Sequence, residues 1–163
     1  MELNPYAKYL GDRDPIAVLE STAARLFRVV DRLPEEELQL RPPSGKWSGR
    51  EIVAHLADCE IAFAFRLKQT LAEDHPVMQP FDQDRWAARY ANFDMSNALR
   101  LFSALRDWNL LLFDELTPEQ WQRPTTHPER GTMTLRTIAE TMAGHDLNHL
   151  AQFERLARPA AIP

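Results

Sequence analysis

Hydrophobic side chains recur every three to four residues along four long stretches of the chain, which is the spacing of helices buried on one face. The pattern predicts helices over residues 15–32, 48–71, 97–116 and 135–157. No sustained alternation of apolar and polar residues, bounded by turn residues, indicates a β-strand. We therefore expect an all-α protein in which residues 1–163 form a single domain, a four-helix bundle.

Residues at the expected helix ends agree with this interpretation. Asp14 followed by Pro15 favours a helix start, because aspartate accepts a bond from a free backbone N–H and proline fits the first helical position. Ser48 and Glu51 have the spacing of a capping box at the start of the second long helix. A second capping box predicts a short helix over residues 117–121.

The connections between the long helices differ in length. Residues 34–38 predict one short acidic turn, and residues 123–133 predict a loop. The connection over residues 72–95 is long enough to cross the bundle, so the helices need not alternate in direction. It is expected to contain a short helix over residues 82–90 that begins at Asp82, because connections of this length usually have structure or function of their own.

Composition and charge argue against a nucleic-acid-binding protein, a membrane-spanning protein and a protein with an intrachain disulfide. The chain has 163 residues and a net charge of −5, and an acidic protein lacks the basic surface that nucleic-acid phosphates require. No apolar run approaches the roughly 20 residues that span a bilayer. The single cysteine, Cys59, excludes an intrachain disulfide, and residues 1–5 do not resemble a signal peptide. We expect a cytoplasmic protein that binds neither nucleic acid nor membranes.

Three histidines give the strongest chemical signal in the sequence. His145 and His149 are four residues apart, so they share one face of the last helix, and the helical period assigns both to the core. His55 has a corresponding position on the second helix. Burying three imidazoles is costly unless their nitrogens have partners, and one metal ion would satisfy all three. The pair alone is equally compatible with core packing, but the third histidine favours a metal site.

Neighbouring residues could complete such a site. Asp146 follows His145 where a His-Glu-x-x-His protease would have glutamate, so that class is disfavoured. Asp146, or Asp58 one turn from the histidine of the second helix, could accept a bond from a second ring nitrogen. Cys59 could approach the metal, although a small buried core residue is its more common role. Arg66 is expected to extend past apolar neighbours towards solvent.

Loop residues leave alternatives open. His127 could line the mouth of the site, but a surface position is favoured, and His75 is expected to be exposed. In the long connection we weigh substrate binding equally against a structural role, in which Asp82 caps a short helix and Trp86 fills the core. The residues considered for substrate binding are Asp82, Asp84, Arg85 and Trp86.

Four segments of the chain resemble the DinB-like superfamily, in particular its second DinB-like branch, which is related to bacterial thiol transferases. The matching segments occur in the family's order and are residues 46–60, 81–86, 126–131 and 145–152. The resemblance implies a four-helix bundle in up-down-down-up order, often a homodimer. It also implies a divalent metal ion, zinc or nickel, held by His55, His145 and His149.

The resemblance implies less about the reaction. Some relatives are transferases or isomerases that use a low-molecular-weight thiol, whereas others have no established activity. We expect a metal-dependent enzyme that activates a thiol or a water molecule for a small-molecule substrate, with a thiol-dependent S-transferase favoured and a hydrolase next. The alternative is a non-catalytic stress-response or ligand-binding bundle whose metal is structural. No catalytic or thiol-binding residue can be assigned from the sequence.

Overall fold

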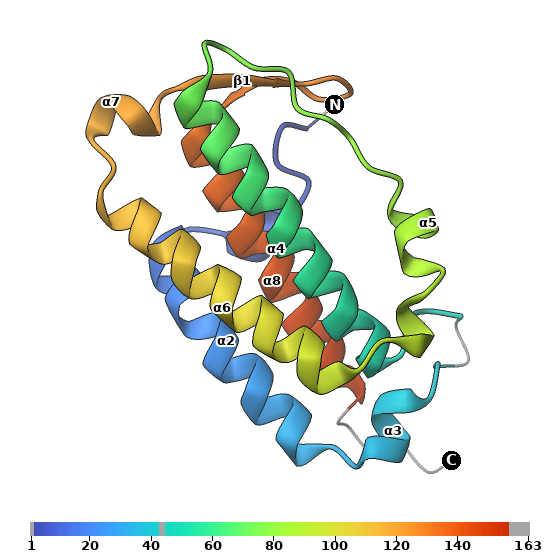
Figure 1. Ribbon diagram of the computed structural model, residues 1–163. Helices are drawn as coiled ribbons and strands as arrows, with labels where there is room; N and C mark the ends of the chain where they lie inside the picture. The colour runs from blue at the N-terminus through green and yellow to red at the C-terminus, as the bar shows by residue number, and fades with distance from the viewer. Residues whose placement is uncertain (1, 43–44, 157–163) are drawn as a thin grey trace.

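Four long helices dominate the computed structural model, which describes residues 2–42 and 45–156 (Figure 1). They are α2 (Pro15–Arg32), α4 (Gly49–Ala72), α6 (Met95–Asp114) and α8 (Leu135–Leu156). The expected helical bundle is confirmed, and the predicted end of the last helix, near residue 157, lies just outside the described residues.

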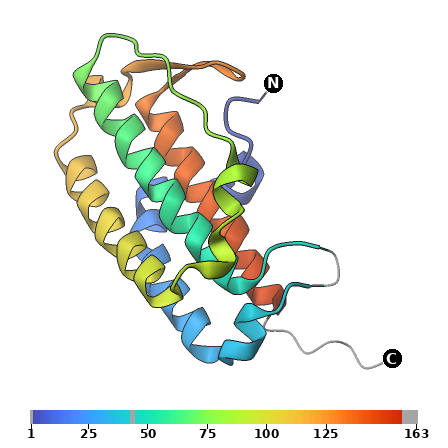
Figure 2. The ribbon, with the colours of Figure 1, turned by 45° about the vertical axis from the view of Figure 1, so that its right-hand side comes forward.

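The direction of the helices explains the long connection. Figures 1 and 2 show that α4 and α6 run side by side in the same direction, whereas α2 and α8 run the opposite way. This is the expected up-down-down-up order. Because α4 and α6 are parallel, residues 73–94 must return along the length of the bundle before α6 can begin. That return places the connection across one side of the bundle.

The predicted helix caps are present. The side chain of Asp14 accepts a bond from the Ala17 N–H at 3.1 Å, and Ser48 and Glu51 form both bonds of a capping box. The third long helix begins two residues earlier than expected, because Asp94 caps it by accepting from the Asn97 N–H at 2.7 Å.

Shorter elements fill the connections. The helix expected over residues 82–90 is shorter than predicted and is followed by a separate 3-10 turn, and a helix near the N-terminus was not predicted. These elements are α1 (Ala7–Leu10), α3 (Glu35–Gln39), α5 (Gln83–Ala87), η1 (Tyr90–Asn92) and α7 (Pro118–Trp121). The last of them has the expected capping box.

The loop predicted over residues 123–133 is wrong in most of its length. Strands β1 (Pro124–His127) and β2 (Gly131–Thr134) form an antiparallel hairpin there. Residues 76–78 pair with β1, since the Met78 N–H donates to the Thr126 carbonyl at 2.8 Å. The strands have four residues each and are rich in threonine, so they lack the apolar alternation that marks a strand in sequence.

A layer of buried polar residues divides the core. One apolar cluster includes Leu19, Leu67 and Met142, and the other includes Phe102 and Phe153. The buried polar side chains near the boundary of the two clusters are His55 and Glu60 on α4, Arg106 and Asn109 on α6, and His145, Asp146 and His149 on α8. Within the described part of the chain, no helix is both long and apolar enough to cross a membrane.

Candidate metal centre

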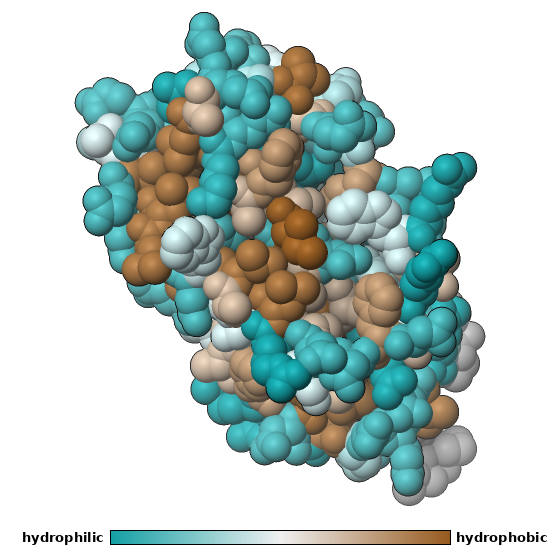
Figure 3. All heavy atoms as spheres, viewed as in Figure 1, coloured by the Kyte–Doolittle hydropathy of each residue, from teal (hydrophilic) through white to brown (hydrophobic). Residues whose placement is uncertain are grey.

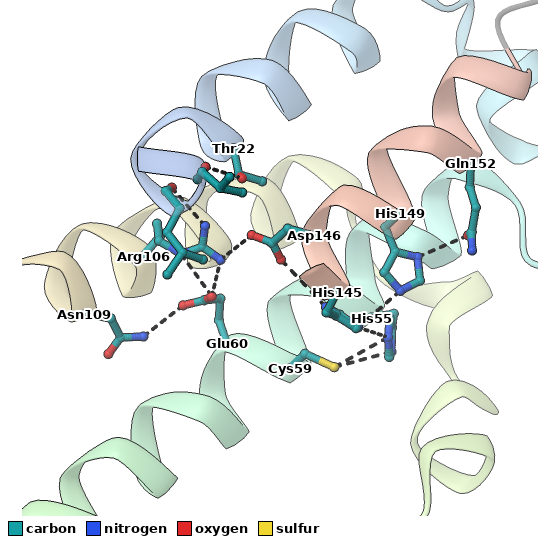
Figure 4. A network of polar contacts seen from close by, with 12 residues as sticks. Thr22, His55, Cys59, Glu60, Arg106, Asn109, His145, Asp146, His149 and Gln152 are labelled. Atoms are coloured by element: carbon teal, nitrogen blue, oxygen red, sulfur yellow. Dashed lines mark hydrogen bonds and ion pairs between the residues drawn. The ribbon is translucent and has the colours of Figure 1, made fainter. Parts of the chain in front are cut away.

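Three imidazoles meet in this polar layer. The Nε2 atom of His145 lies 3.0 Å from Nε2 of His55 and 3.2 Å from Nε2 of His149 (Figure 4). All three residues are buried, with exposed fractions of 1%, 3% and 4% for His55, His145 and His149. The structure therefore brings together, from α4 and α8, the three histidines that the sequence singled out.

The contacts among these rings require a ring hydrogen or a metal cation between the nitrogen atoms. Burial, followed by the charge of His145, lowers the pKa of His55 to about 2 and that of His149 to about 3, so both rings are neutral. Burial also opposes protonation of His145, but Cys59 and Asp146 raise its pKa to about 9. Three nitrogen lone pairs at this separation would repel one another, so either a proton or a metal cation must lie among them.

The spacing of the nitrogen atoms suits a metal ion. Zinc–nitrogen bonds of about 2.0–2.1 Å in a tetrahedron place ligand nitrogens roughly 3.3 Å apart. The separations of the two pairs that include His145, 3.0 and 3.2 Å, are close to that value. The Nδ1 atom of His145 is buried without a hydrogen-bond partner, as expected of a ring whose orientation is not set by hydrogen bonding alone.

Two side chains lie behind the rings. The Nδ1 of His149 is 3.1 Å from Oε1 of Gln152, so an Nδ1–H there leaves the Nε2 lone pair free for the cluster. Asp146 Oδ1 is 3.7 Å from Nδ1 of His145, so this carboxylate lies near the ring without a hydrogen bond to it. The other expected candidate, Asp58, lines a separate hollow beside α6.

The sequence interpretation missed the partners of Asp146. Arg106 of α6 donates from Nη2 to Asp146 Oδ2 at 2.7 Å and from Nε to Glu60 Oε1 at 3.1 Å (Figure 4). Asn109 donates to the other oxygen of Glu60 at 2.9 Å. The charge of Arg106 overcomes the effect of burial and lowers the pKa of Asp146. A charged residue on a helix normally indicates a solvent-facing side, so the sequence carried no signal for this network.

Cys59 has the expected buried core position and also lies beside the histidine cluster. The residue is buried in the core, and its Sγ lies 3.5 Å from Nε2 of His55. Ligand atoms of Cys59, His55 and His145 all fall within 4.8 Å of one another, so these residues could also hold a metal ion. The thiol is therefore a fourth potential ligand at the histidine cluster.

The N-terminal segment supplies a wall that was not predicted. The ring of Tyr6 packs edge-on against His145, with ring centroids 5.1 Å apart. This approach depends on Gly144, since a Cβ at that position would lie 2.5 Å from the Tyr6 carbonyl oxygen. A glycine inside a helix, next to a candidate ligand, was the signal that could have indicated a close approach.

A cavity of about 150 Å³ opens beside the cluster and reaches Cys59 and His145. Its walls include Arg66, His127 and Phe81. The favoured surface position of His127 is therefore wrong, because the side chain is buried and faces the cavity. Arg66 is half-buried along the same wall, whereas His75 is exposed as expected.

Only some of the residues considered in the long connection lie beside the histidine cluster. Asp82 caps α5 by accepting from the Arg85 N–H at 3.0 Å, which confirms its structural role. Trp86 does not fill the core: it is 39% exposed and stacks on Phe81 at 4.5 Å. Asp84 lines a second hollow, which reaches His55 and His149 and shares Tyr6 and Gln83 with the first. The cluster is thus bordered by two openings.

Known proteins share this architecture. A model of the DinB superfamily matches residues 19–153. Protein OB0782 of Oceanobacillus iheyensis, named as a candidate metal-dependent hydrolase, is 33% identical over 86% of this chain and 82% of its own length. YfiT of Bacillus subtilis, which carries the same description, is 30% identical over 88% of this chain and 82% of its own length.

Solved structures agree with the sequence matches. A structure of YfiT, described as having an unusual four-helix bundle topology, superposes with a TM-score of 0.83 at 29% identity, over 88% of this chain and 83% of that chain. A mycothiol-dependent maleylpyruvate isomerase gives a TM-score of 0.66 at 11% identity, over 93% of this chain and 62% of that chain, which is a likeness of fold. The bundle, its topology and the matched residues together show that the chain belongs to the DinB superfamily.

Proposed function

We propose that this protein is a metal-dependent enzyme in which His55, His145 and His149 hold a divalent cation, zinc or nickel. The convergence of three buried Nε2 atoms, at 3.0 and 3.2 Å, carries the proposal. Neutral imidazole is the form that binds such metals, and burial keeps two of the rings neutral. The descriptions of the relatives as candidate metal-dependent hydrolases support it further.

The sequence favoured thiol transfer, but the descriptions of the relatives as candidate metal-dependent hydrolases lead us to favour hydrolysis. A divalent ion with neutral ligands supplies Lewis-acid chemistry, since it retains its full charge and favours the deprotonated form of a water or thiol beside it. The protein's own part is to orient His149 through Gln152, to hold the Asp146 carboxylate near His145, and to admit a small molecule through the openings beside His145 and His149. Transfer of a low-molecular-weight thiol uses the same chemistry and stays a prediction.

The alternative is a structural metal in a non-catalytic stress-response or ligand-binding bundle. The position of Cys59 beside His55 and His145 favours this alternative, because the thiol could be a fourth protein ligand that leaves no open position on the metal. The cavity beside Cys59 and His145 favours the enzyme, since a structural metal needs no access for small molecules.

Elemental analysis tests the site directly. After reconstitution and desalting, we expect about one divalent ion per chain for the wild type and strongly reduced metal in His145→Ala and His149→Ala. His75→Ala is the matched control, because His75 is an exposed histidine outside the cluster, and it should retain its metal. Full metal content in both cluster variants would exclude the proposed ligands.

Turnover distinguishes the reactions. We expect the metal-loaded protein, but not the chelated protein, to hydrolyse members of a panel of ester and amide substrates. A parallel panel offers glutathione, bacillithiol or mycothiol with electrophiles. Metal-dependent reaction in the thiol panel alone would establish the transferase, and metal bound without turnover in either panel would favour the structural alternative.

A homodimer is also proposed. Apolar side chains are exposed on the outer faces of the parallel helices α4 and α6, in the view of Figure 3. They are Ile61, Phe65, Leu101, Trp108 and Leu111. Exposed patches of this kind often mark protein interfaces. Sedimentation equilibrium should show a dimer that Phe65→Lys and Leu111→Lys weaken, and a monomeric wild type would contradict the proposal.

The expected cytoplasmic location stays a prediction of the sequence.

A further inference from the structure

The cavity beside His145 contains positively charged side chains that the histidine cluster does not explain. Two arginines line it, Arg66 from α4 and Arg130 from the turn of the β1–β2 hairpin, and both are half-buried. Arg66 lies over the ring of Phe81, with Cζ 5.5 Å from the centroid, and donates to the Gln79 carbonyl at 3.3 Å. Neither contact neutralises its charge.

In the part of the chain that the structure describes, the two guanidinium groups lack carboxylate partners. Among the described residues, neither Arg66 nor Arg130 has a carboxylate oxygen within 4.0 Å. Glu129 also borders the cavity, but it is exposed to solvent. Burial lowers the pKa of Arg66, and the charge of Arg130 adds to that effect, whereas Cys59 opposes it. Two half-buried cations that share one cavity repel each other, and an anion between them would remove that repulsion.

His127 adds a hydrogen-bond donor to the same wall. The backbone N–H of Glu129 donates to Nδ1 of His127 at 3.2 Å, so the neutral ring carries its proton on Nε2. Burial, with the charges of Arg130 and Arg66, lowers the pKa of His127 and keeps the ring neutral. The cavity therefore offers two guanidinium groups and an imidazole N–H, all of which are donors.

We propose that this cavity binds the anionic group, a carboxylate or a phosphate, of the substrate whose reacting bond lies at the histidine cluster. The substrate role rests on the proposed function, whereas the anion site itself does not require a metal. Guanidinium groups match carboxylates and phosphates in charge and in donor geometry. The cavity reaches His145, so an anion held by Arg66 and Arg130 would fix the orientation of the molecule that carries it.

The test is an NMR titration of the full-length protein, followed through the arginine Nε–H signals. Inorganic phosphate and acetate are added separately at constant ionic strength, with metal loaded and with metal removed by a chelator. We expect saturable binding in both states, and about tenfold weaker binding or more in Arg66→Met and Arg130→Met. Arg100→Met is the matched control, because Arg100 is an exposed arginine whose described partner is a neutral side chain, Asn97.

The outcomes distinguish a phosphate ligand from a carboxylate ligand. They also distinguish failure of the anion site from failure of the proposed metal site. Tighter binding of phosphate would indicate a phosphorylated substrate, and tighter binding of acetate a carboxylate substrate. No saturable binding of either anion to the wild type, or unchanged affinity in the methionine variants that fold, would overturn the proposal. Arg130 is in a surface hairpin, so Arg130→Met can still test the proposal if Arg66→Met does not fold. Metal content, measured in the same samples, reports on the proposed function independently.

Discussion

Arg106 Nη2 donates to Asp146 Oδ2 at 2.7 Å, which links α6 to the residue directly after a candidate metal ligand. Arg106→Met would leave Glu60 and Asp146 buried without their cation, and breaking a buried ion pair in this way typically costs about 3–5 kcal/mol. We expect a loss of that size in the free energy of unfolding, measured by urea denaturation. In Arg136→Met, which removes an exposed ion pair with Glu140, the loss should stay below about 1 kcal/mol. Equal losses in the two variants would contradict the prediction.

Removal of Cys59 tests whether the proposed centre is open. If the three histidines are sufficient, Cys59→Ala should retain about one metal ion per chain after reconstitution. The fold should lose on the order of 1 kcal/mol, because a small buried side chain is shortened. Loss of the metal in Cys59→Ala, measured by elemental analysis, would instead identify the thiol as a fourth ligand and favour the structural alternative.

Gly144→Ala should destabilise the protein although alanine is the better helix former. The added Cβ would lie 2.5 Å from the carbonyl oxygen of Tyr6, so the N-terminal segment must move away from α8. Overpacking of this kind typically costs about 1–3 kcal/mol. We expect a lower melting temperature and greater proteolytic sensitivity of residues 4–10. An increase in stability, as for an exposed helical glycine, would show that this approach is not required.

Glu51 should make stability dependent on acid pH. Burial raises the pKa of this carboxyl, but hydrogen bonds from Arg41 and Ser48 outweigh it and lower the pKa below its ordinary value. The charged form therefore stabilises the fold above the unfolded pKa of about 4.3, and this contribution disappears as pH falls through the lower folded pKa.

Glu51→Gln isolates that contribution, since glutamine can also close a capping box. The variant should be less stable than the wild type at pH 7, and the difference should shrink as the pH falls below about 4. Glu36→Gln, an exposed change on α3, should show little difference at either pH. A difference for Glu51→Gln that does not vary with pH would contradict the assignment. Urea denaturation at each pH provides the measurement.

Helical periodicity was sufficient to predict the long helices and to place His55, His145 and His149 on core-facing positions. Those predictions succeed because the signal repeats over many residues and is local to each helix. Caps such as Ser48 could be predicted for the same reason, since both partners of the capping box are close in sequence.

The features that were missed depend on contacts between distant segments. Arg106 is buried because its partners come from two other helices, and nothing near it in the sequence indicates them. The β1–β2 hairpin is held partly by residues 76–78, and Tyr6 is placed by a glycine far along the chain. The burial of His127 has the same cause, because its strand forms only by pairing with residues 131–134 and 76–78.

The parallel arrangement of α4 and α6 has a consequence for the evolution of this fold. The candidate ligands are anchored in two core helices, whereas residues 73–94, the hairpin and the N-terminal segment provide much of the cavity wall. Those outer segments can acquire insertions and substitutions without disturbing the packing that aligns the histidines. One bundle can therefore diversify its ligands by exchanging peripheral loops while the same inner scaffold is inherited.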